Sequence, residues 1–333
     1  IAARFGYPLV ENGEVAAAIS RHWHKLKRGD MPSRFLNQAL VPADADILHN
    51  SCGTAPGIHM KTKPGDKFPD REIFMLPGPP PELCPMFEKQ VLPVLRKKLE
   101  NTIYSKLYHV VGVPESVVED RMIPLIATAP SLSVAYCAAP EHVKLFLTSK
   151  KFETVADTAH KVREVFKGEL LSDSSSSLAE EVVHLLRKHD ASLSVAESCT
   201  GGLISKLMTD IPGASDVFKG GLTAYANQVK EDVLGVSEST LRTCGAVSID
   251  CAKEMVGKVG EKFRTDAALS VTGIAGPGGG TIEKPVGLVY IGVKFRDKTF
   301  VKECHFRGGR EQIRLRAAAF ALNQLRRAIL GLE

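Results

Sequence analysis

Ser198 lies in the segment 196–202, Ala-Glu-Ser-Cys-Thr-Gly-Gly, at a position where its side chain could take part in chemistry. The apolar run 191–195 before it predicts a strand, and residues 203–208 after it have a helical pattern. At such a turn the Ser198 hydroxyl would be exposed and would face the free N–H groups of the helix start, which can hold a developing oxyanion. The glycines after it would let a substrate approach the backbone closely. A serine that only caps the helix fits equally well, so this segment alone leaves both interpretations open.

Lys230 is a second candidate, in the segment 220–230. The sequence predicts a strand over 222–226, so that Tyr225 and Asn227 share one face by the strand's period of two. A lysine here would ordinarily be a solvated surface charge. If it reaches Ser198 and loses part of its hydration, its pKa falls and its neutral amine can act as a base.

Two further segments have features that are typical of anion-binding sites. Residues 271–280 read Val-Thr-Gly-Ile-Ala-Gly-Pro-Gly-Gly-Gly, a strand end followed by a loop whose N–H groups can curl around an anion. This loop matches neither a Walker loop nor a dinucleotide motif, and a mobile hairpin connection is the alternative. Arg310 and Arg314 lie one turn apart near the start of a predicted helix, where they oppose the helix dipole. An anionic ligand would compensate that cost, whereas a solvated pair is the alternative.

The elements that must position these residues alternate between strand and helix, which predicts an α/β domain over 178–333. Its expected strands are 192–196, 222–226, 267–271, 286–295 and 299–306, and its expected helices are 178–188, 249–263 and 312–330. Before it, the serine run 172–177 is expected to be a flexible or capping linker, and 104–171 a small α+β module. Residues 1–103 are expected to form a partial α/β domain with a rigid proline loop at 77–81. The predicted fold class is therefore multidomain α/β.

The composition is that of a globular protein, with 44% hydrophobic and 24% charged residues among 333. No apolar run approaches the ~20 residues that span a bilayer, so no membrane partner is expected. The net charge of +5 is spread along the chain, and nucleic acid is therefore not indicated as a partner. The seven cysteines are far apart and form no CxxC pair, which predicts reduced thiols, a cytoplasmic location and no metal site. Residues 1–9 read like the middle of a domain, so we expect a segment upstream.

Together, the four segments closely resemble the carboxy-terminal domain of the CinA family of competence/damage-inducible proteins, with Lys-Pro-Val-Gly at 284–287 adding to the third. The resemblance covers about residues 178–330. It implies a nicotinamide mononucleotide deamidase, which hydrolyses the amide of that nucleotide to the acid and releases ammonia. The family is regarded as using a serine/lysine dyad, and no cofactor is expected for this reaction.

The resemblance implies that Ser198 is the nucleophile and Lys230 the base, with Tyr225, Asn227 and Thr272 lining the site. We expect the substrate phosphate to bind Arg310 and Arg314, and Ser215 is a second, weaker candidate for a site hydroxyl. The remaining residues expected to bind substrate are Cys199, Thr200, Gly201, Gly202, Gly273 and Gly276. The Cys199 thiol is a rival nucleophile, but no histidine lies near it in the sequence to activate it.

The amino-terminal part resembles the same family less completely. Residues 38–42, 50–57 and 76–82 are similar to the second half of its molybdopterin-binding-like domain, and 111–116 to the start of its KH-like middle domain. In some members the first domain is an ADP-ribose pyrophosphatase that uses a divalent metal, but its glycine-rich first half has no counterpart in this sequence. A pyrophosphatase and a non-enzymatic, competence-linked binding protein are therefore the alternative functions. The expected ligands are nicotinamide mononucleotide and, secondarily, ADP-ribose, and the expected assembly is a homodimer.

Overall fold

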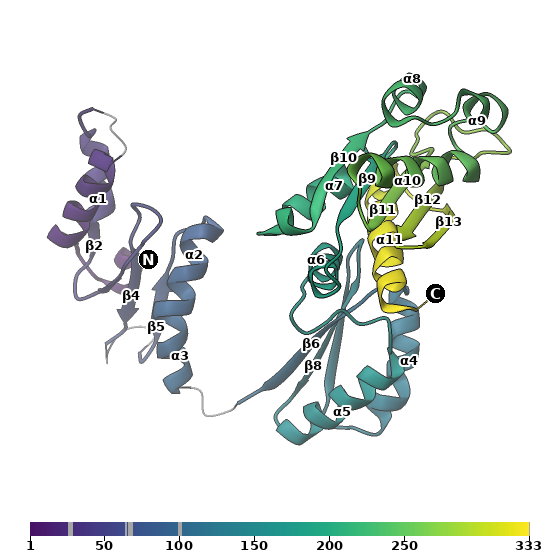
Figure 1. The fold of residues 1–333 in the computed structure, drawn as a ribbon. Helices are drawn as coiled ribbons and strands as arrows, with labels where there is room; N and C mark the ends of the chain where they lie inside the picture. Colours follow the sequence, from purple (N-terminus) through teal and green to yellow (C-terminus); the bar gives the residue numbers. More distant parts are fainter. Residues whose placement is uncertain (26–28, 64, 66–68, 99–101, 333) are drawn as a thin grey trace. The chain divides into compact units, whose positions relative to one another are not determined.

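The computed structural model describes residues 1–25, 29–63, 65, 69–98 and 102–332. The chain divides into two compact units, Ile1–Thr102 and Ile103–Glu333 (Figure 1). Each unit combines helices with β-sheet, and the fold class is multidomain α/β, as the sequence predicts. No helix within the described ranges is long and apolar enough to cross a bilayer.

The first unit contains small antiparallel sheets packed against short helices. Its strands are β1 (Leu9–Glu11) paired with β2 (Leu40–Pro42), and β3 (Asp46–Leu48), β4 (Gly57–Lys61) and β5 (Glu72–Met75) in that order. Its helices are α1 (Gly13–Lys25), α2 (Pro80–Met86) and α3 (Leu92–Lys98), with 3₁₀ turns at Ala2–Phe5 and Ser33–Ala39 and a π-turn at Phe87–Val91. The proline loop is shorter than predicted, because α2 already begins at Pro80. Proline is tolerated in the first helical turn, where its missing N–H would have no partner.

The second unit begins with a three-stranded antiparallel sheet in the order β6-β8-β7. Its elements are β6 (Tyr104–Val110), α4 (Glu115–Ala127), β7 (Ser133–Ala138), β8 (Val143–Ser149) and α5 (Phe152–Val165). Along β8, Val143, Leu145 and Leu147 are buried and alternate with less buried residues, because successive side chains of a strand point to opposite faces. The buried face packs against Val118 on α4 and Val162 on α5, so both helices cover the same side of the sheet.

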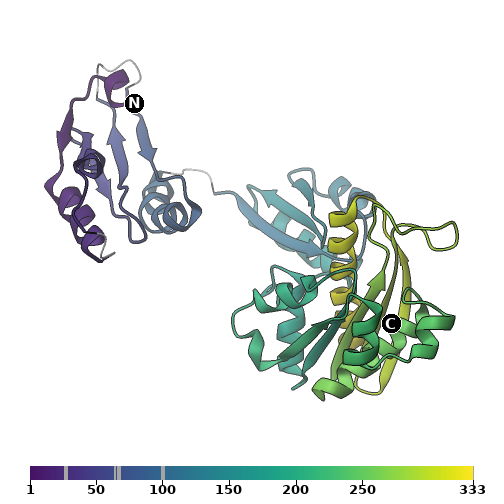
Figure 2. The ribbon, with the colours of Figure 1, turned by 90° about the horizontal axis from the view of Figure 1, so that it is seen from above.

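The remainder of the second unit is a five-stranded sheet between two layers of helices, with the strand order β10-β9-β11-β12-β13. The strands are β9 (Leu193–Glu197), β10 (Phe218–Thr223), β11 (Ala267–Gly273), β12 (Leu288–Phe295) and β13 (Lys298–His305). On one face lie α6 (Leu178–Lys188), α7 (Leu203–Thr209) and α11 (Arg310–Leu330), and Figure 2 shows α11 in yellow beside the strands. On the other face lies α10 (Ile249–Phe263). Shorter turns are Ala214–Asp216, α8 (Asn227–Val229), the π-turn Lys230–Leu234 and α9 (Glu238–Thr243).

The strand predicted over 222–226 is displaced, since β10 ends at Thr223 and α8 begins at Asn227. The reason is that β10 is an edge strand, which among the described residues pairs with β9 alone, and β9 itself ends at Glu197, opposite Thr223. With no partner strand beyond that point, the chain leaves the sheet. The expectation that Tyr225 and Asn227 share one face of a strand is therefore wrong.

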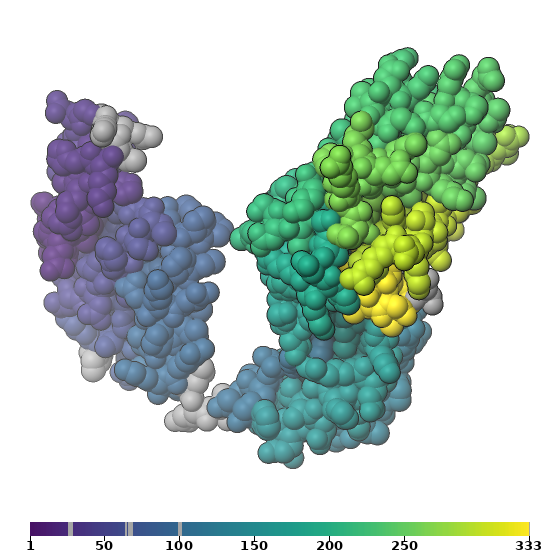
Figure 3. All heavy atoms as spheres, in the orientation of Figure 1, coloured from purple at the N-terminus to yellow at the C-terminus, as the bar shows by residue number. Residues whose placement is uncertain are grey.

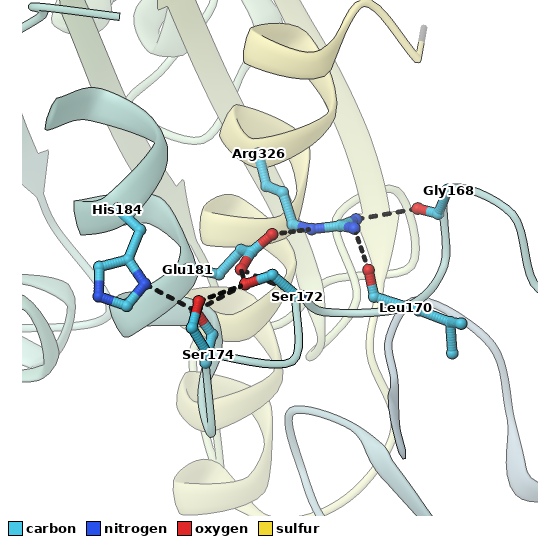
Figure 4. Close-up of polar contacts among 8 residues, drawn as sticks. Gly168, Leu170, Ser172, Ser174, Glu181, His184 and Arg326 are labelled. Carbon is cyan, nitrogen blue, oxygen red and sulfur yellow. Dashed lines mark hydrogen bonds and ion pairs between the residues drawn. The ribbon is translucent and has the colours of Figure 1, made fainter. Parts of the chain in front are cut away.

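A buried polar cluster joins the two parts of the second unit, whose atoms form one continuous body in Figure 3. Arg326 on α11 donates hydrogen bonds to the carbonyls of Gly168 and Leu170, and its Nε lies 3.8 Å from the Glu181 carboxylate on α6 (Figure 4). Glu181 also accepts from the N–H and hydroxyl of Ser172. The serine run is thus hydrogen-bonded into the structure, and its last member, Ser177, caps α6.

Candidate functional site

The site forms at the carboxyl edge of three parallel strands. The strand β9 pairs in parallel with β10 on one side and with β11 on the other, so all three end at the same edge. The chain passes from β9 to β10 in one direction along the sheet and then returns to β11 on the far side of β9. This is a topological switch point, where crossovers diverge and ligands bind in open α/β sheets. Ser198, the first residue after β9, lies at that point.

The turn after β9 is held by Glu197, a residue that the sequence interpretation did not single out. All five residues of β9 are buried, and the Glu197 carboxylate is 1% exposed. It accepts hydrogen bonds from the N–H of Ile204 at 3.0 Å, the N–H of Ser205 at 2.9 Å and the Ser205 hydroxyl at 2.8 Å. The carboxylate therefore caps α7, a placement that the helix dipole favours.

This capping corrects the expectation that the start of the helix would hold an oxyanion. At the start of α7, Glu197 occupies the N–H groups of Ile204 and Ser205, and the Ser198 N–H donates to the Val271 carbonyl at 2.9 Å. Within the described chain, the N–H groups of Cys199, Thr200 and Gly202 have no oxygen acceptor. The open donors thus belong to the turn itself, where Gly202 has a φ of 92°, a conformation that glycine adopts without strain.

Lys230 reaches the serine. Its side chain is 1% exposed, and its Nζ lies 3.0 Å from Ser198 Oγ. The same nitrogen donates to the carbonyls of Ala224 at 2.8 Å and Tyr225 at 3.1 Å. These two acceptors orient two of the amine's hydrogens, so the remaining position of the nitrogen faces Ser198 Oγ. In the neutral amine, that position is the lone pair.

The local chain geometry explains how Lys230 is turned inward. Lys230 begins a π-helical turn that ends at Leu234, directly after the short helix α8. Such turns shift the side-chain register of a helix by one residue and are frequent at functional sites. Leu234 is buried in the core between the sheet and α10, which anchors this turn against the sheet.

The electrostatic surroundings favour the neutral amine. Burial lowers the pKa of Lys230 below its usual 10.5, and no carboxylate of the described chain forms an ion pair with it. Burial also raises the pKa of Cys199 and of Cys251 to about 11, so both thiols are protonated at neutral pH. A protonated, 6% exposed Cys199 does not support the rival interpretation that a thiolate is the nucleophile.

Arg310 and Arg314 connect the loops around this edge. Arg310 donates to the Gly276 carbonyl at 2.7 Å and to the Tyr225 hydroxyl at 2.9 Å. Arg314 donates to the Thr200 carbonyl at 2.7 Å. A guanidinium has five N–H donors, so each arginine retains donors beyond those used in these bonds. The alternative of a simple solvated pair does not fit these contacts, because both arginines are hydrogen-bonded to loops at this edge of the sheet.

The other predicted residues differ in their burial and hydrogen-bond partners. Thr200 is fully buried, and its hydroxyl has no hydrogen-bond partner among the described residues. Thr272 donates to the Ala246 carbonyl at 2.6 Å and thereby holds the loop before α10. Asn227 is exposed at the start of α8. Gly273 and Gly276 end β11 and begin its loop, and Gly201 follows Thr200 in the turn.

Ser215 is not part of this site. It lies in the turn Ala214–Asp216, which precedes β10 at the amino edge of the sheet, whereas Ser198 follows β9 at the carboxyl edge. The spacing of residues in the sequence does not distinguish the two edges, because only the strand direction does. The Ser215 hydroxyl is exposed. The expectation that it lies in the site is therefore wrong.

The amino-terminal resemblance implies a divalent metal, but the described residues offer no group of ligands for it. Across the part of the chain that the structure describes, no three His, Cys, Asp or Glu side chains lie close enough together to hold a metal ion. In the first unit, His59 stacks on Phe74 and lies 3.3 Å from Asp46 and 3.7 Å from Glu72, as a buried histidine between two carboxylates. The described residues therefore do not fit the metal.

The chain is similar to a described protein family and to known sequences and solved structures. Residues 175–329 match the family model described as the CinA C-terminal domain. The chain is 40% identical to a competence-damage inducible protein of Thermoanaerobacter pseudethanolicus, over 100% of this chain and 80% of that protein. It is also 40% identical to a CinA-like protein of Dictyoglomus turgidum, over 89% of this chain and 72% of the relative. A solved structure of a competence/damage inducible protein from Agrobacterium tumefaciens is 42% identical, covers 46% of this chain and 93% of its own, and has a TM-score of 0.45.

Proposed function

The chain belongs to the CinA family, and we propose that it hydrolyses the amide of nicotinamide mononucleotide to nicotinic acid mononucleotide and ammonia, with Ser198 as nucleophile and Lys230 as base. The observation that carries this proposal is the 3.0 Å contact between Lys230 Nζ and Ser198 Oγ. A buried amine with two carbonyl acceptors, and with no ion-pair partner among the residues that the structure describes, is suited to accept a proton from a hydroxyl.

The first half of the reaction forms an ester. Neutral Lys230 removes the proton from Ser198 as Oγ attacks the carboxamide carbon, which gives a tetrahedral oxyanion. The ammonium of Lys230 then returns the proton to the departing nitrogen as the carbon–nitrogen bond breaks. Ammonia leaves, and the nicotinoyl group remains as an ester on Ser198.

The second half regenerates the enzyme. Lys230 takes a proton from water as the water oxygen attacks the ester carbon. The carbon–Oγ bond then breaks, and the proton passes to Ser198. An amide is a poor electrophile, so division into two steps with a covalent intermediate lowers each barrier. The scheme uses no cofactor.

The turn after β9 supplies the stabilising groups. The open N–H groups of Cys199, Thr200 and Gly202 can hold the oxyanion, which is worth roughly 3 kcal/mol per donor. Arg310 and Arg314 retain donors for the phosphate, and phosphate binding there would position the amide over Ser198.

The test is ammonia release from nicotinamide mononucleotide in metal-free buffer, measured for the unmodified chain, Ser198→Ala and Ser215→Ala. We expect Ser198→Ala to reduce kcat at least about 10⁴-fold. Ser215→Ala is the matched control, because its hydroxyl lies at the opposite edge of the sheet, and it should leave kcat unchanged. If the unmodified chain releases no ammonia, or if Ser198→Ala retains full turnover, the proposal is wrong.

A further inference from the structure

The loop between β11 and β12, residues 274–287, lies at the site and is held near both of its ends. Its base is closed by hydrogen bonds from the Ile274 N–H to the Leu288 carbonyl at 2.9 Å and from the Gly287 N–H to the Ile274 carbonyl at 2.8 Å. Beyond this base, residues 277–283 are all exposed, and three of them are consecutive glycines. Ordering such a segment costs much conformational entropy, so its position depends on the contacts that hold its two arms.

On the outgoing arm, Gly276 is the point of contact with the site. Its carbonyl accepts a hydrogen bond from Arg310 at 2.7 Å. Gly276 is buried, and a Cβ at this position would lie 2.7 Å from the Cγ1 of Val286 on the returning arm. The Val286 side chain therefore packs directly on the Gly276 backbone. The place of the carbonyl that holds Arg310 thus depends on where the returning arm puts Val286.

On the returning arm, Lys284 is the anchor. Its side chain is half-buried, and its Nζ donates to the carbonyls of Cys244 at 2.9 Å and Val247 at 2.8 Å. Hydrogen bonds from an ammonium group are stronger than those between neutral groups. Only Pro285, whose ring fixes φ, separates Lys284 from Val286. A side chain that holds residue 284 therefore also determines the position of Val286.

The segment that receives Lys284 is itself fixed beside Ser198. Between the two acceptor carbonyls in the sequence lies Ala246, whose carbonyl accepts from the Thr272 hydroxyl at 2.6 Å. Thr272 lies on β11, and the carbonyl of the preceding residue, Val271, accepts from the Ser198 N–H at 2.9 Å. Lys284 therefore ties the loop to the same framework that positions the proposed nucleophile.

From these contacts we propose that Lys284 is a positioning residue for the substrate phosphate. It holds the returning arm of the loop, so that Gly276 keeps Arg310 in place to bind that group. The inference rests on the proposed function, in which Arg310 contacts the phosphate and Lys284 touches no reacting atom. Because the phosphate is remote from the amide, loss of Lys284 should weaken substrate binding more than it slows the chemical step.

Steady-state kinetics of the full chain with nicotinamide mononucleotide test this role. We expect Lys284→Met to raise KM at least about fivefold and to leave kcat within about threefold of the unmodified chain. Lys284→Arg keeps a cationic donor for the two carbonyls and should recover most of the loss. Lys253→Met, at an exposed position on α10, is the matched control and should change neither constant. An unchanged KM in Lys284→Met would overturn the proposal.

A double-mutant cycle with Arg310 tests the path through which Lys284 acts. In a chain that already carries Arg310→Met, Lys284→Met should lower kcat/KM less than about twofold, because the group that it positions is gone. The apparent pKa that reports Lys230 in the pH profile should not move in Lys284→Met, whereas a general disturbance of the site would move it. A loss of kcat/KM that is equal with and without Arg310, or a shifted apparent pKa, contradicts the proposal.

Hydrogen exchange of the unliganded protein separates failure of this inference from failure of the proposed function. The Thr281 N–H donates to the carbonyl of residue 284 at 2.9 Å, and the N–H of residue 284 donates to the Thr281 hydroxyl at 3.0 Å. Lys284→Met should speed exchange at both amides at least about tenfold, while the amides of β9 exchange as before. If exchange speeds but the unmodified chain releases no ammonia, Lys284 anchors the loop and the proposed function is wrong. If exchange at both amides is unchanged, the inference about Lys284 is wrong whatever the activity.

Discussion

Lys230 is the residue on which the proposed chemistry most depends, because its amine must be neutral while the side chain is fully buried. Its carbonyl partners at Ala224 and Tyr225 can accept hydrogen bonds from the ammonium and from the amine, and the bonds from the ammonium are stronger. Burial disfavours the charge, and its effect lowers the pKa of Lys230. Ser198 is the one partner that gains from the neutral form, because only then can it donate its proton.

The pH dependence of activity follows from that lowered pKa. We expect kcat/KM for deamidation to rise with pH along a limb whose apparent pKa lies below 10.5. The limb reports deprotonation of Lys230 in the free enzyme. A profile that is flat between about pH 6 and 10 would contradict the assignment of Lys230 as the base.

The lowered pKa of Lys230 also predicts how the free energy of unfolding depends on pH. In the window between the folded pKa and 10.5, the unfolded chain holds a proton on Lys230 that the folded chain has released, so the free energy of unfolding rises with pH. Lys230→Met removes this contribution. In denaturant titrations, the stability of the unmodified chain relative to Lys230→Met should increase from about pH 7 to 10. The exposed Lys253→Met is the control and should show no such trend.

A substitution at Cys199 tests whether its thiol or the neighbouring Ser198 hydroxyl is the nucleophile. Its thiol is buried, with a pKa raised to about 11, so it should take no part as a nucleophile. We expect Cys199→Ser to keep kcat within about threefold of the unmodified chain. A loss of kcat as large as that caused by Ser198→Ala would indicate that the Cys199 thiol is the nucleophile.

At the scale of elements, the turn between β9 and α7 is the feature that converts a strand end into a site. Glu197 occupies the N–H groups of Ile204 and Ser205, and the π-turn at Lys230–Leu234 directs the lysine inward from the neighbouring connection. The π-turn is a local departure from α-helical geometry, whereas Glu197 is a capping residue at the end of a buried strand. Glu197 satisfies the start of α7, while the N–H groups of Cys199, Thr200 and Gly202 have no oxygen acceptor among the described residues.

Glu197→Gln tests this capping role. The substitution keeps the side-chain shape but removes the charge, and a hydrogen bond to a charged group is worth about 1.5–3 kcal/mol. We expect Tm to fall by several degrees, and kcat to fall more than KM rises, because the turn loses its position. Glu238→Gln, at the exposed start of α9, is the control and should leave both unchanged. An unaltered Tm for Glu197→Gln would show that the carboxylate charge does not hold α7.

At the scale of the whole molecule, the second unit depends on the buried cluster of Arg326, Glu181 and Ser172 shown in Figure 4. Arg326 is 2% exposed and Glu181 is 5% exposed, so each charge relies on the other and on backbone partners. Burial lowers the pKa of Arg326, while the Glu181 carboxylate opposes that shift. The cluster joins α6 and α11 to the segment that leaves the α+β module.

Breaking this cluster at one partner should be more damaging than removing both charges. Arg326→Met leaves Glu181 buried without its cation, which costs about 3–5 kcal/mol of unfolding free energy. The double variant Arg326→Met with Glu181→Leu should recover part of that loss. Urea unfolding of the unmodified chain, Arg326→Met, Glu181→Leu and the double variant measures the coupling energy between the two residues. Arg242→Met, at an exposed position, is the control. If the two losses simply add, the residues are not coupled.

Much of the architecture could be predicted from the sequence because it depends on local patterns. The alternation of apolar strands and amphipathic helices predicts the α/β sheet, and the strand over 267–271 and the helices over 178–188 and 249–263 lie within the elements observed. The segments around Ser198 and Lys230 could be singled out because serine, glycine and lysine in those positions offer chemistry that a plain core does not need. Glu197 could have been found by the same logic, as a carboxylate at the end of a buried strand.

Tertiary structure decided what local patterns do not contain. The strand order determines that Ser198 and the loop carrying Lys230 share one edge while Ser215 lies at the other, and the end of β9 determines where β10 stops. Which N–H groups remain open depends on Glu197 folding back onto α7, and the lowered pKa of Lys230 depends on burial by distant residues. These are non-local effects, because each requires segments far apart in the chain to meet before a pKa, a free donor or a distance of 3.0 Å exists.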